Sequence, residues 1–600
     1  MAKVTFQFEN AAAPISIDVQ NGERVLDVAR KANVAIDAPC SGNGSCKKCK
    51  VQIGGEEVLA CQTNVSGDLT VTVPDIAGAY KSRMKIADLS DEREIEIFNA
   101  IQADLSEFPR TTNLALLHAD LTPPTLDDTT ADWERLANAL GLESASLYAL
   151  TKLPDALRGN NWSVDCVVRG THLLDIGVNL KLYGAAIDIG TTTVAAVLVD
   201  LESGEVIAKA SGGNGQIRFG ADVIHRIVES DKPGGLQQLQ RAVISETIKP
   251  IFDALDKPIY RVVVAGNTTM NHLFLGLPPQ SIRLEPYVPV LNEFPLLPAH
   301  ALGIGEPDSH LIVAPNVGSY VGGDITAGTL ASGLWKLEDE FALFIDLGTT
   351  GELVFGNRDF MFCCACSAGP ALEGGDMSCG MRATDGAIES CVIDADTLTP
   401  TYSVIGGVKP IGLCGSGIID TVAEMFRCRI INPKGKITAE GNRVKTSEID
   451  GVKSFVIAFA DETEHGRDLE ISEIDLDNFI RTKAAIFSAI KTMLEAVDFS
   501  IDVISQVKIA GGIGSGINFE NAIRIGMLPD IDRSLYTYIG NSSLAGAYAM
   551  LVSDDVTAKV TEIQQNMTYI DLSSHPGYME EFVSACFLPH TDANLFPSIA

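Results

Sequence analysis

Residues 183–201 read YGAAIDIGTTTVAAVLVDL, an apolar strand that runs through Asp188 into a Gly-Thr turn and then into a second apolar strand. The pattern returns at residues 341–357 as FALFIDLGTTGELVFGN. One such DxGTT turn would be weak evidence, because glycine-rich turns between strands are common. Two copies, each after a buried strand, predict an internally duplicated α/β fold.

The two turns combine the backbone freedom and the side chains that phosphate binding needs. Glycine lets the backbone approach phosphate oxygens, and threonine hydroxyls add hydrogen-bond donors. An aspartate at the end of each strand suits Mg²⁺, usually held through water. The candidate phosphate residues are Gly190, Thr191, Thr192, Thr193, Gly348, Thr349 and Thr350, and the candidate Mg²⁺ carboxylates are Asp188 and Asp346. Glu352, just after the second turn, either helps to position water or is an ordinary solvated strand residue, and both interpretations stay open.

A third element, VKIAGGIGSGINFE at residues 507–520, is a strand followed by a flat glycine loop. Such a loop admits an adenine and a ribose, and its candidate residues are Gly511, Gly512, Gly514 and Ser515. Together the three elements resemble the ATPase superfamily of actin, sugar kinases and acetate kinase, over roughly residues 183–555. That resemblance implies a duplicated, ribonuclease H-like α/β ATPase that binds ATP with Mg²⁺.

Near the N-terminus, residues 38–61 read APCSGNGSCKKCKVQIGGEEVLAC and place Cys40, Cys46, Cys49 and Cys61 at the spacing C-x5-C-x2-C-x11-C. Four thiolates suit an iron–sulfur cluster. They also suit zinc, but zinc ribbons usually show two CxxC knuckles and this stretch has one. Alternating apolar strands and a short helix surround the loop, which favours a β-grasp domain that ends near residue 80.

This N-terminal stretch resembles the [2Fe-2S] ferredoxin-like domains, with two departures from the plant-type pattern. The first gap between cysteines is five residues instead of four. The last gap is short, so the fourth ligand, Cys61, would come from the far strand of a hairpin turned at Gly54 and Gly55.

Length and charge limit the remaining possibilities. A chain of 600 residues is too long for one hydrophobic core. We predict a ferredoxin-like domain at 1–80, a linker at 81–115, a small middle domain at 116–182 and the actin-like ATPase with a C-terminal strand–helix extension at 183–600.

The net charge of −33 argues against binding nucleic acid or anionic lipid, which need a basic surface. The N-terminus MAKVTFQFEN lacks an apolar signal segment, and we find no apolar run that would span a membrane, so we expect a cytoplasmic protein.

The combination of these parts is more specific than either part alone. With GNTTMNHL (266–273), SAGPALEGG (367–375) and CGSGIID (414–420), the chain resembles, nearly end to end, the reductive activators of corrinoid proteins. The resemblance implies that ATP is used while one electron passes from the cluster to an inactive Co(II) corrinoid, restoring Co(I). It also implies a corrinoid protein of a methyltransferase system as partner and an external low-potential electron donor, and self-association as a homodimer is possible.

Two alternatives remain from the sequence. The first is an ATP-driven electron activator of another low-potential enzyme, such as a dehydratase or reductase; those activators commonly share a [4Fe-4S] cluster across a dimer. The second is a non-enzymatic, ATP-switched redox-sensing scaffold. A further choice concerns FCCACSAGP, where Cys363, Cys364 and Cys366 either form a second metal site or are small side chains packed after a strand; we favour packing.

Overall fold

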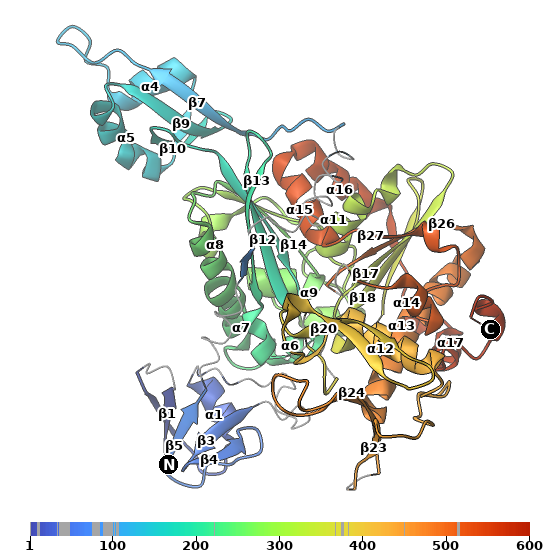
Figure 1. Ribbon diagram of the computed structural model, residues 1–600. Coiled ribbons are helices and arrows are strands. Elements are labelled where there is room, and N and C mark those ends of the chain that lie inside the picture. The colour runs from blue at the N-terminus through green and yellow to red at the C-terminus, as the bar shows by residue number, and fades with distance from the viewer. Residues whose placement is uncertain are drawn as a thin grey trace. The chain divides into compact units, whose positions relative to one another are not determined.

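The structure is a computed structural model (Figure 1). It describes residues 2–8, 13–32, 34, 36, 49–74, 85–87, 100, 103, 107–220, 222–366, 368–373, 377–381, 383–448, 451–512 and 516–599. The chain divides into two compact units, each described by itself below. The first unit comprises Met1–Ala327 and Ser543–Gln564, and the second comprises Gly328–Ser542 and Gln565–Ala600.

The N-terminal domain is a five-stranded sheet in the order β2-β1-β5-β3-β4. Its elements are β1 (Ala2–Phe8), β2 (Ile15–Val19), α1 (Val25–Lys31), β3 (Lys50–Ile53), β4 (Glu56–Leu59) and β5 (Leu69–Val73). Alternate residues of β1, namely Ala2, Val4 and Phe6, are buried, as the apolar alternation predicts. The first and last strands pair in parallel, which gives the predicted β-grasp arrangement.

A small four-stranded sheet in the order β7-β9-β10-β8 follows in the sequence. Its elements are β7 (Leu114–Asp120), α4 (Asp132–Leu140), β8 (Ser144–Ala145), α5 (Leu147–Gly159), β9 (Ser163–Arg169) and β10 (His172–Gly177). Strands β9 and β10 have the sequences SVDCVVR and HLLDIG and lie within the predicted middle domain. Leu136 of α4 and Leu153 of α5 are buried in the apolar core of this part.

A seven-stranded sheet in the order β15-β16-β14-β11-β12-β13-β6 carries the first DxGTT turn. Its strands are β6 (Lys85–Ala87), β11 (Tyr183–Ile189), β12 (Thr193–Asp200), β13 (Val206–Gly213), β14 (Arg261–Gly266), β15 (Leu297–Pro298) and β16 (His310–Val313). Helices α6 (Val223–Ser230), α7 (Gly235–Val243), α8 (Lys249–Leu255), α9 (Thr268–Leu275) and α10 (Gln280–Arg283) lie between them in the chain. The short strand β6 comes from the predicted linker and pairs with β13 at the sheet edge, a pairing that the charged sequence of 81–115 did not indicate.

The second DxGTT turn lies in a six-stranded sheet in the order β27-β26-β17-β18-β19-β28. Its strands are β17 (Phe341–Leu347), β18 (Gly351–Gly356), β19 (Met361–Cys366), β26 (Ile504–Ala510), β27 (Tyr536–Tyr538) and β28 (Met567–Tyr569). Strands β17, β18 and β19 form an antiparallel meander and β26 pairs in parallel with β17. Strands β11, β12 and β13 with β14 repeat this pattern, so the predicted duplication is confirmed.

The remaining strands belong to the second unit, and the remaining helices belong to either unit. Two three-stranded sheets contain β20 (Ala387–Ile393), β21 (Pro400–Val404), β22 (Gly412–Leu413), β23 (Val444–Thr446), β24 (Lys453–Ala458) and β25 (Leu469–Ser472). The helices are α11 (Gly323–Ser332), α12 (Gly415–Arg427), α13 (Glu473–Ala496), α14 (Phe519–Arg524), α15 (Ser542–Val552), α16 (Asp554–Asn566) and α17 (Tyr578–Ala585). The predicted C-terminal strand and helix are β28 and α17.

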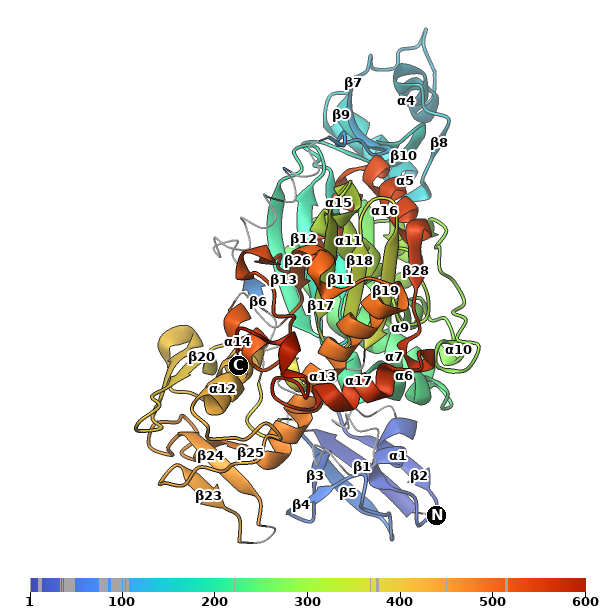
Figure 2. The ribbon, with the colours of Figure 1, turned by 90° about the vertical axis from the view of Figure 1, so that its right-hand side faces the viewer.

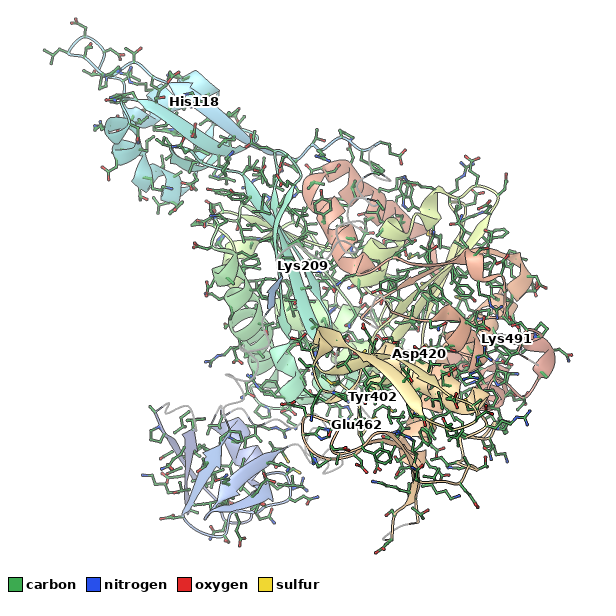
Figure 3. All side chains as sticks on the ribbon, in the orientation of Figure 1. His118, Lys209, Tyr402, Asp420, Glu462 and Lys491 are labelled. Atoms are coloured by element: carbon green, nitrogen blue, oxygen red, sulfur yellow. The ribbon has the colours of Figure 1, made fainter. Side chains whose placement is uncertain are left out.

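The long helix α13 holds the C-terminal segment in place (Figure 2). Lys491 of α13, labelled in Figure 3, forms an ion pair with Glu581 of α17 at 2.9 Å. About two turns earlier on the helix, the fully buried Lys483 donates hydrogen bonds of 2.6 Å to the carbonyl oxygens of Phe587 and Pro589. Burial lowers the pKa of Lys483 from its ordinary value of 10.5 to about 7.

This buried lysine predicts a pH-dependent stability. Between pH 7 and 9 the unfolded chain keeps the Lys483 proton and the folded chain releases it, so this group makes stability rise with pH, by up to about 1.4 kcal/mol per unit. The volume-conserving variant Lys483→Met should lack that contribution. Thermal unfolding of both proteins across this range measures it, and the difference between the two curves removes the other titrating groups. Parallel curves would contradict the assignment.

Candidate functional site

The first DxGTT turn joins β11 to β12 in a tight conformation that requires glycine. A Cβ at Gly190 would lie 2.6 Å from the carbonyl oxygen of Thr193, closer than real Cβ contacts come. Asp188 stands next to the end of β11, in register with Ala195 of β12. The Asp188 carboxylate therefore lies just before a tight turn, and the turn can form because Gly190 has no side chain.

Two polar side chains, Asn267 and Arg226, fix this turn through hydrogen bonds. Asn267 donates from its amide to the Thr191 hydroxyl at 3.1 Å, and the fully buried Arg226 donates to the Thr191 carbonyl at 2.5 Å. Arg226 also donates to the carbonyl of Gly220 at 2.9 Å and so ties α6 to the turn. Asn267 belongs to the GNTTMNHL motif, but no local pattern in the sequence marked Arg226.

Two more contacts fix the ends of the same turn. Asn214 belongs to none of the sequence motifs, yet its amide donates to the Gly190 carbonyl at 2.9 Å and its backbone N–H donates to the Thr192 carbonyl at 2.9 Å. Ser543, at the start of α15, donates to the Asp188 carboxylate at 2.8 Å. This hydroxyl donor helps to fix the orientation of the Asp188 carboxylate.

The second turn joins β17 to β18 and carries an extra carboxylate. Asp346 is in register with Glu352 on the neighbouring strand, so the two side chains project from the same face of the sheet. Glu352 is buried and accepts a hydrogen bond from the Thr350 hydroxyl. Its burial excludes the solvated-strand interpretation. The equivalent position opposite Asp188 is Ala195, so the two copies differ chemically at this point.

The glycine loop after β26 packs directly against this second turn. Gly511 has a φ of +105°, and a Cβ there would lie 2.3 Å from the Leu347 carbonyl oxygen and 2.8 Å from a carboxylate oxygen of Asp346. Gly512 has open space around its Cβ position. Gly514 and Ser515 lie outside the described residues. The structure thus brings Asp346, Glu352 and Gly511 together within the second unit.

These two neighbouring glycines predict opposite responses to alanine. Gly511→Ala adds a clash and a strained φ, and strain of that kind costs about 1–3 kcal/mol at a single residue. We expect a lower melting temperature and weaker ATP binding in calorimetric titration. Gly512→Ala is the matched control for stability alone, because a Cβ there meets no described atom within 4 Å, and it should keep the melting temperature of the unsubstituted chain. Equal losses of melting temperature in the two variants would contradict the packing described here.

Two of the four predicted cluster cysteines lie among the described residues. Cys49 immediately precedes β3 and Cys61 follows β4, and the hairpin between them turns at Gly54 and Gly55 with φ of 61° and 88°. The N–H of Ala60 donates to the Cys49 carbonyl at 2.8 Å, so both cysteines reach the same end of the hairpin, where they are buried. This placement fits the predicted fourth ligand. Cys40 and Cys46 lie outside the described residues.

The cysteines of FCCACSAGP agree with the packing interpretation. Cys363, Cys364 and Cys366 lie on β19 and are buried, the last two within the apolar core of the second unit. Burial raises the pKa of all three thiols well above the usual range, as is typical of packed, unreactive cysteines. Within the described ranges, we find no cluster of three or more histidine, cysteine or carboxylate side chains placed to hold a metal ion.

Membrane insertion finds no support in the described helices. None of them combines the length and the apolar character that crossing a membrane requires.

Comparison with protein families gives consecutive matches along the chain. Residues 9–69 match the 2Fe-2S iron–sulfur cluster binding domain, residues 103–181 the RACo linker region and residues 183–337 the RACo middle region. Residues 340–600 match the C-terminal domain of RACo, described as the ASKHA domain. The predicted ferredoxin-like and actin-like parts are thereby confirmed. The domain boundaries and the individual ligand and nucleotide residues remain predictions.

Individual proteins match over most of the chain. The corrinoid activation enzyme RamQ of Eubacterium limosum is 32% identical over 94% of this chain and 96% of its own length. The [Co(II) methylated amine-specific corrinoid protein] reductase of Methanosarcina barkeri is 24% identical over 64% of this chain and 73% of its own. A solved structure described as a reductive activator for corrinoid, iron–sulfur protein is 39% identical, covers 100% of both chains and has a TM-score of 0.74.

Proposed function

We infer the function from one premise: the chain belongs to the family of reductive activators of corrinoid proteins. We propose that it restores an inactive Co(II) corrinoid on a partner protein of a methyltransferase system to Co(I), with hydrolysis of ATP. A cluster held by the four N-terminal cysteines would supply the one electron that the cobalt gains, and an external low-potential donor would replace that electron. The observation that carries this proposal is the similarity to corrinoid activators over nearly the whole chain, through both the cluster domain and the ASKHA domain.

We propose that Cys40, Cys46, Cys49 and Cys61 hold a [2Fe-2S] cluster. A cluster of this type supplies a one-electron carrier. The described residues support the assignment, because the β3–β4 hairpin presents Cys49 and Cys61 at one end and buries both thiols in the domain core. The degree of burial from solvent influences the reduction potential of such a cluster.

We propose that the DxGTT turns bind the phosphates of ATP and that Asp188 and Asp346 bind its Mg²⁺. The side chains that fix these turns support the assignment, since a pre-positioned loop loses little entropy when it binds. We assign Glu352 to the positioning of the attacking water, because it is buried, lies opposite Asp346 and is oriented by Thr350. Gly511, Gly512, Gly514 and Ser515 are assigned to the adenosine. Self-association as a homodimer stays a prediction that sedimentation analysis can test.

One anaerobic experiment tests the proposal. The reduced chain, Mg-ATP and a Co(II) corrinoid protein are mixed, and the Co(I) absorption band is followed. We expect Co(I) to form with ATP and much more slowly without it. If the cluster reduces another acceptor but never a corrinoid protein, the proposed function is wrong. An EPR signal of a [4Fe-4S] cluster would instead favour an activator of a different low-potential enzyme.

A further inference from the structure

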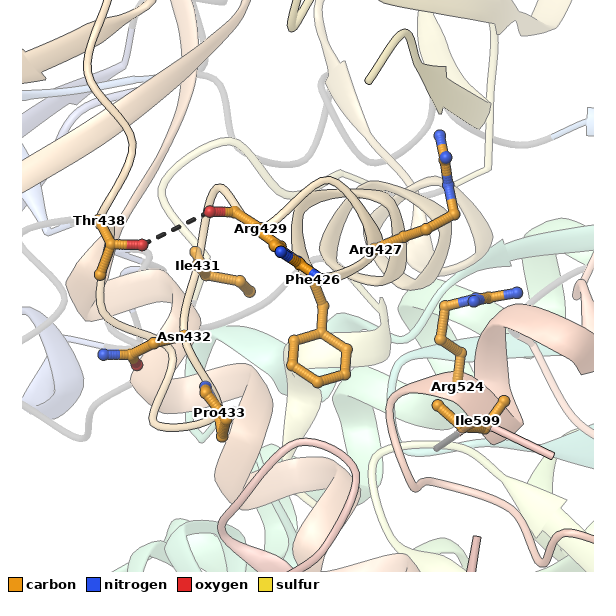
Figure 4. Close-up of a pocket in the computed structure, with 9 residues that line it drawn as sticks. All are labelled: Phe426, Arg427, Arg429, Ile431, Asn432, Pro433, Thr438, Arg524 and Ile599. Carbon is orange, nitrogen blue, oxygen red and sulfur yellow. Dashed lines mark hydrogen bonds between the residues drawn. The ribbon is translucent and has the colours of Figure 1, made fainter. Parts of the chain in front are cut away.

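A pocket of about 490 Å³ lies at the C-terminal end of α12 in the second unit (Figure 4). Its volume is in the range of small-molecule binding sites. The helix itself, the loop that follows it, the end of α14 and the C-terminal segment contribute the lining, which consists of Phe426, Arg427, Arg429, Ile431, Asn432, Pro433, Thr438, Arg524 and Ile599.

This pocket is separate from the nucleotide residues assigned above. The opposite, N-terminal end of α12 faces the glycine loop, where a Cβ on Gly516 would lie 3.5 Å from the Ser416 hydroxyl. Ser416 and Phe426 are ten residues apart on this helix, a distance of about 15 Å. Asp420 of α12, labelled in Figure 3, accepts a 2.8 Å hydrogen bond from Asn521 of α14, which fixes the two helices to each other.

The charge of the lining is opposite to the charge of the chain. Three arginines and, among the described residues, no aspartate or glutamate line the pocket of a protein whose net charge is −33. Arg427 is already engaged, because it donates to both carboxylate oxygens of Glu424, at 2.7 and 2.8 Å, and to the Ile393 carbonyl at 2.5 Å. The Glu424 carboxylate balances its charge, so Arg427 adds little net positive charge to the pocket.

The other two arginines keep donors for a ligand. Arg524 is paired with Glu520 at 3.3 Å through Nη2, its Nε is buried, and its Nη1 has no hydrogen-bond partner within the described part of the chain. The guanidinium of Arg429 has neither an ion-pair nor a hydrogen-bond partner among those residues. A guanidinium has five N–H donors in a planar fork that matches carboxylate and phosphate oxygens.

The backbone conformation of Arg429 is a second observation that favours a role for this side chain in binding. This residue has a φ of +57°, and the N–H of Ile430 after it bonds back to the Met425 carbonyl at 2.8 Å, as at many helix ends. Glycine usually occupies such a left-handed position because any side chain is strained there. The negative end of the α12 dipole favours a basic residue nearby, which Arg427 already supplies. Helix stability alone therefore does not account for an arginine at residue 429.

We propose that this pocket binds a small organic anion with an apolar portion, whose phosphate or carboxylate oxygens accept hydrogen bonds from Arg429 and Arg524. The apolar portion would lie against Phe426 and Ile431, and Ile599 lies next to Arg524 (Figure 4). The site is distinct from the proposed ATP and cluster sites. A failure of the proposed function would therefore not affect this proposal.

Calorimetric titration of the full chain tests this with three probes of similar size: phenyl phosphate, phenylacetate and benzyl alcohol. We expect at least one anion to bind at least about tenfold more tightly than the neutral alcohol, since charge-assisted hydrogen bonds are the stronger ones. The tighter anion identifies phosphate or carboxylate as the natural group. Equal binding of the alcohol, or no binding of either anion at millimolar concentration, would overturn the proposal.

Substitutions at residue 429 sharpen the test. Arg429→Gln should weaken anion binding at least about tenfold by removing a charged donor pair. Lys434→Gln is the matched control, because it removes one positive charge from the same loop but not from the lining, and should leave affinity unchanged. Arg429→Gly relieves the strained φ, so we expect an unchanged or higher melting temperature together with lost binding. Equal losses in the Lys434 control, or retained binding in either Arg429 variant, would refute the site.

Discussion

Cys49→Ser should abolish Co(I) formation and leave ATP hydrolysis close to that of the unsubstituted chain. Cys49 begins the β3–β4 hairpin, and its thiol is buried at the end of the hairpin that also presents Cys61. Serine is a hard oxygen donor and a poor substitute for a thiolate ligand. Changes that merely touch the surroundings of a metal site reduce its function by about 10- to 100-fold, so loss of a direct ligand should exceed that range.

The measurement combines the visible and EPR spectra of the cluster with the Co(I) assay and a phosphate-release assay on the same preparation. Cys586→Ser provides the control, since Cys586 is a partly exposed thiol in the C-terminal segment, outside the cluster domain. Its spectra and both activities should match the unsubstituted chain. A Cys49→Ser protein that keeps a normal cluster spectrum would show that Cys49 is not a ligand.

Asp346→Asn should produce the converse defect: a normal cluster spectrum with ATP hydrolysis reduced by about 100- to 1000-fold, the range seen when one group that stabilises developing charge is removed. Asparagine keeps the size of the side chain, so the close contact with Gly511 is preserved. The substitution removes the negative charge that we assign to Mg²⁺, opposite Glu352 on the neighbouring strand. Co(I) formation should fall with hydrolysis, because the proposed activity depends on ATP.

Asp339→Asn is the control for that variant. Asp339 is exposed and lies two residues before β17, so it changes the net charge equally without touching the second turn. Steady-state hydrolysis at several Mg²⁺ concentrations separates the two cases. Partial rescue of Asp346→Asn by high Mg²⁺ would support the metal assignment. Unchanged hydrolysis in Asp346→Asn would exclude it.

The sequence predicted the features that depend on local pattern. Strand–DxGTT–strand units are short and contiguous, so the order of residues alone places Asp188 and Asp346 at the ends of their strands. The β3–β4 hairpin was predictable for the same reason, because Gly54 and Gly55 mark its turn.

Features that depend on long-range packing escaped prediction. Arg226 donates a hydrogen bond to the Thr191 carbonyl, 35 residues earlier in the sequence. Ser543 donates one to Asp188, 355 residues earlier. Neither residue has a neighbourhood that would distinguish it from an ordinary polar side chain. The burial of Glu352 was likewise undecidable locally, because it follows from the strands that flank β18.

The edge strand β6 sets an upper limit on the distance between the cluster domain and the seven-stranded sheet. It pairs with β13 from Lys85 onward, twelve Cα–Cα steps after Val73 at the end of β5. Twelve such steps reach at most about 40 Å when fully extended. A second link is much shorter, because Arg30 of α1 forms a 3.3 Å ion pair with the buried Glu229 of α6. A partner that receives an electron must therefore come to the cluster domain, because the chain cannot carry that domain farther from the sheet than this length allows.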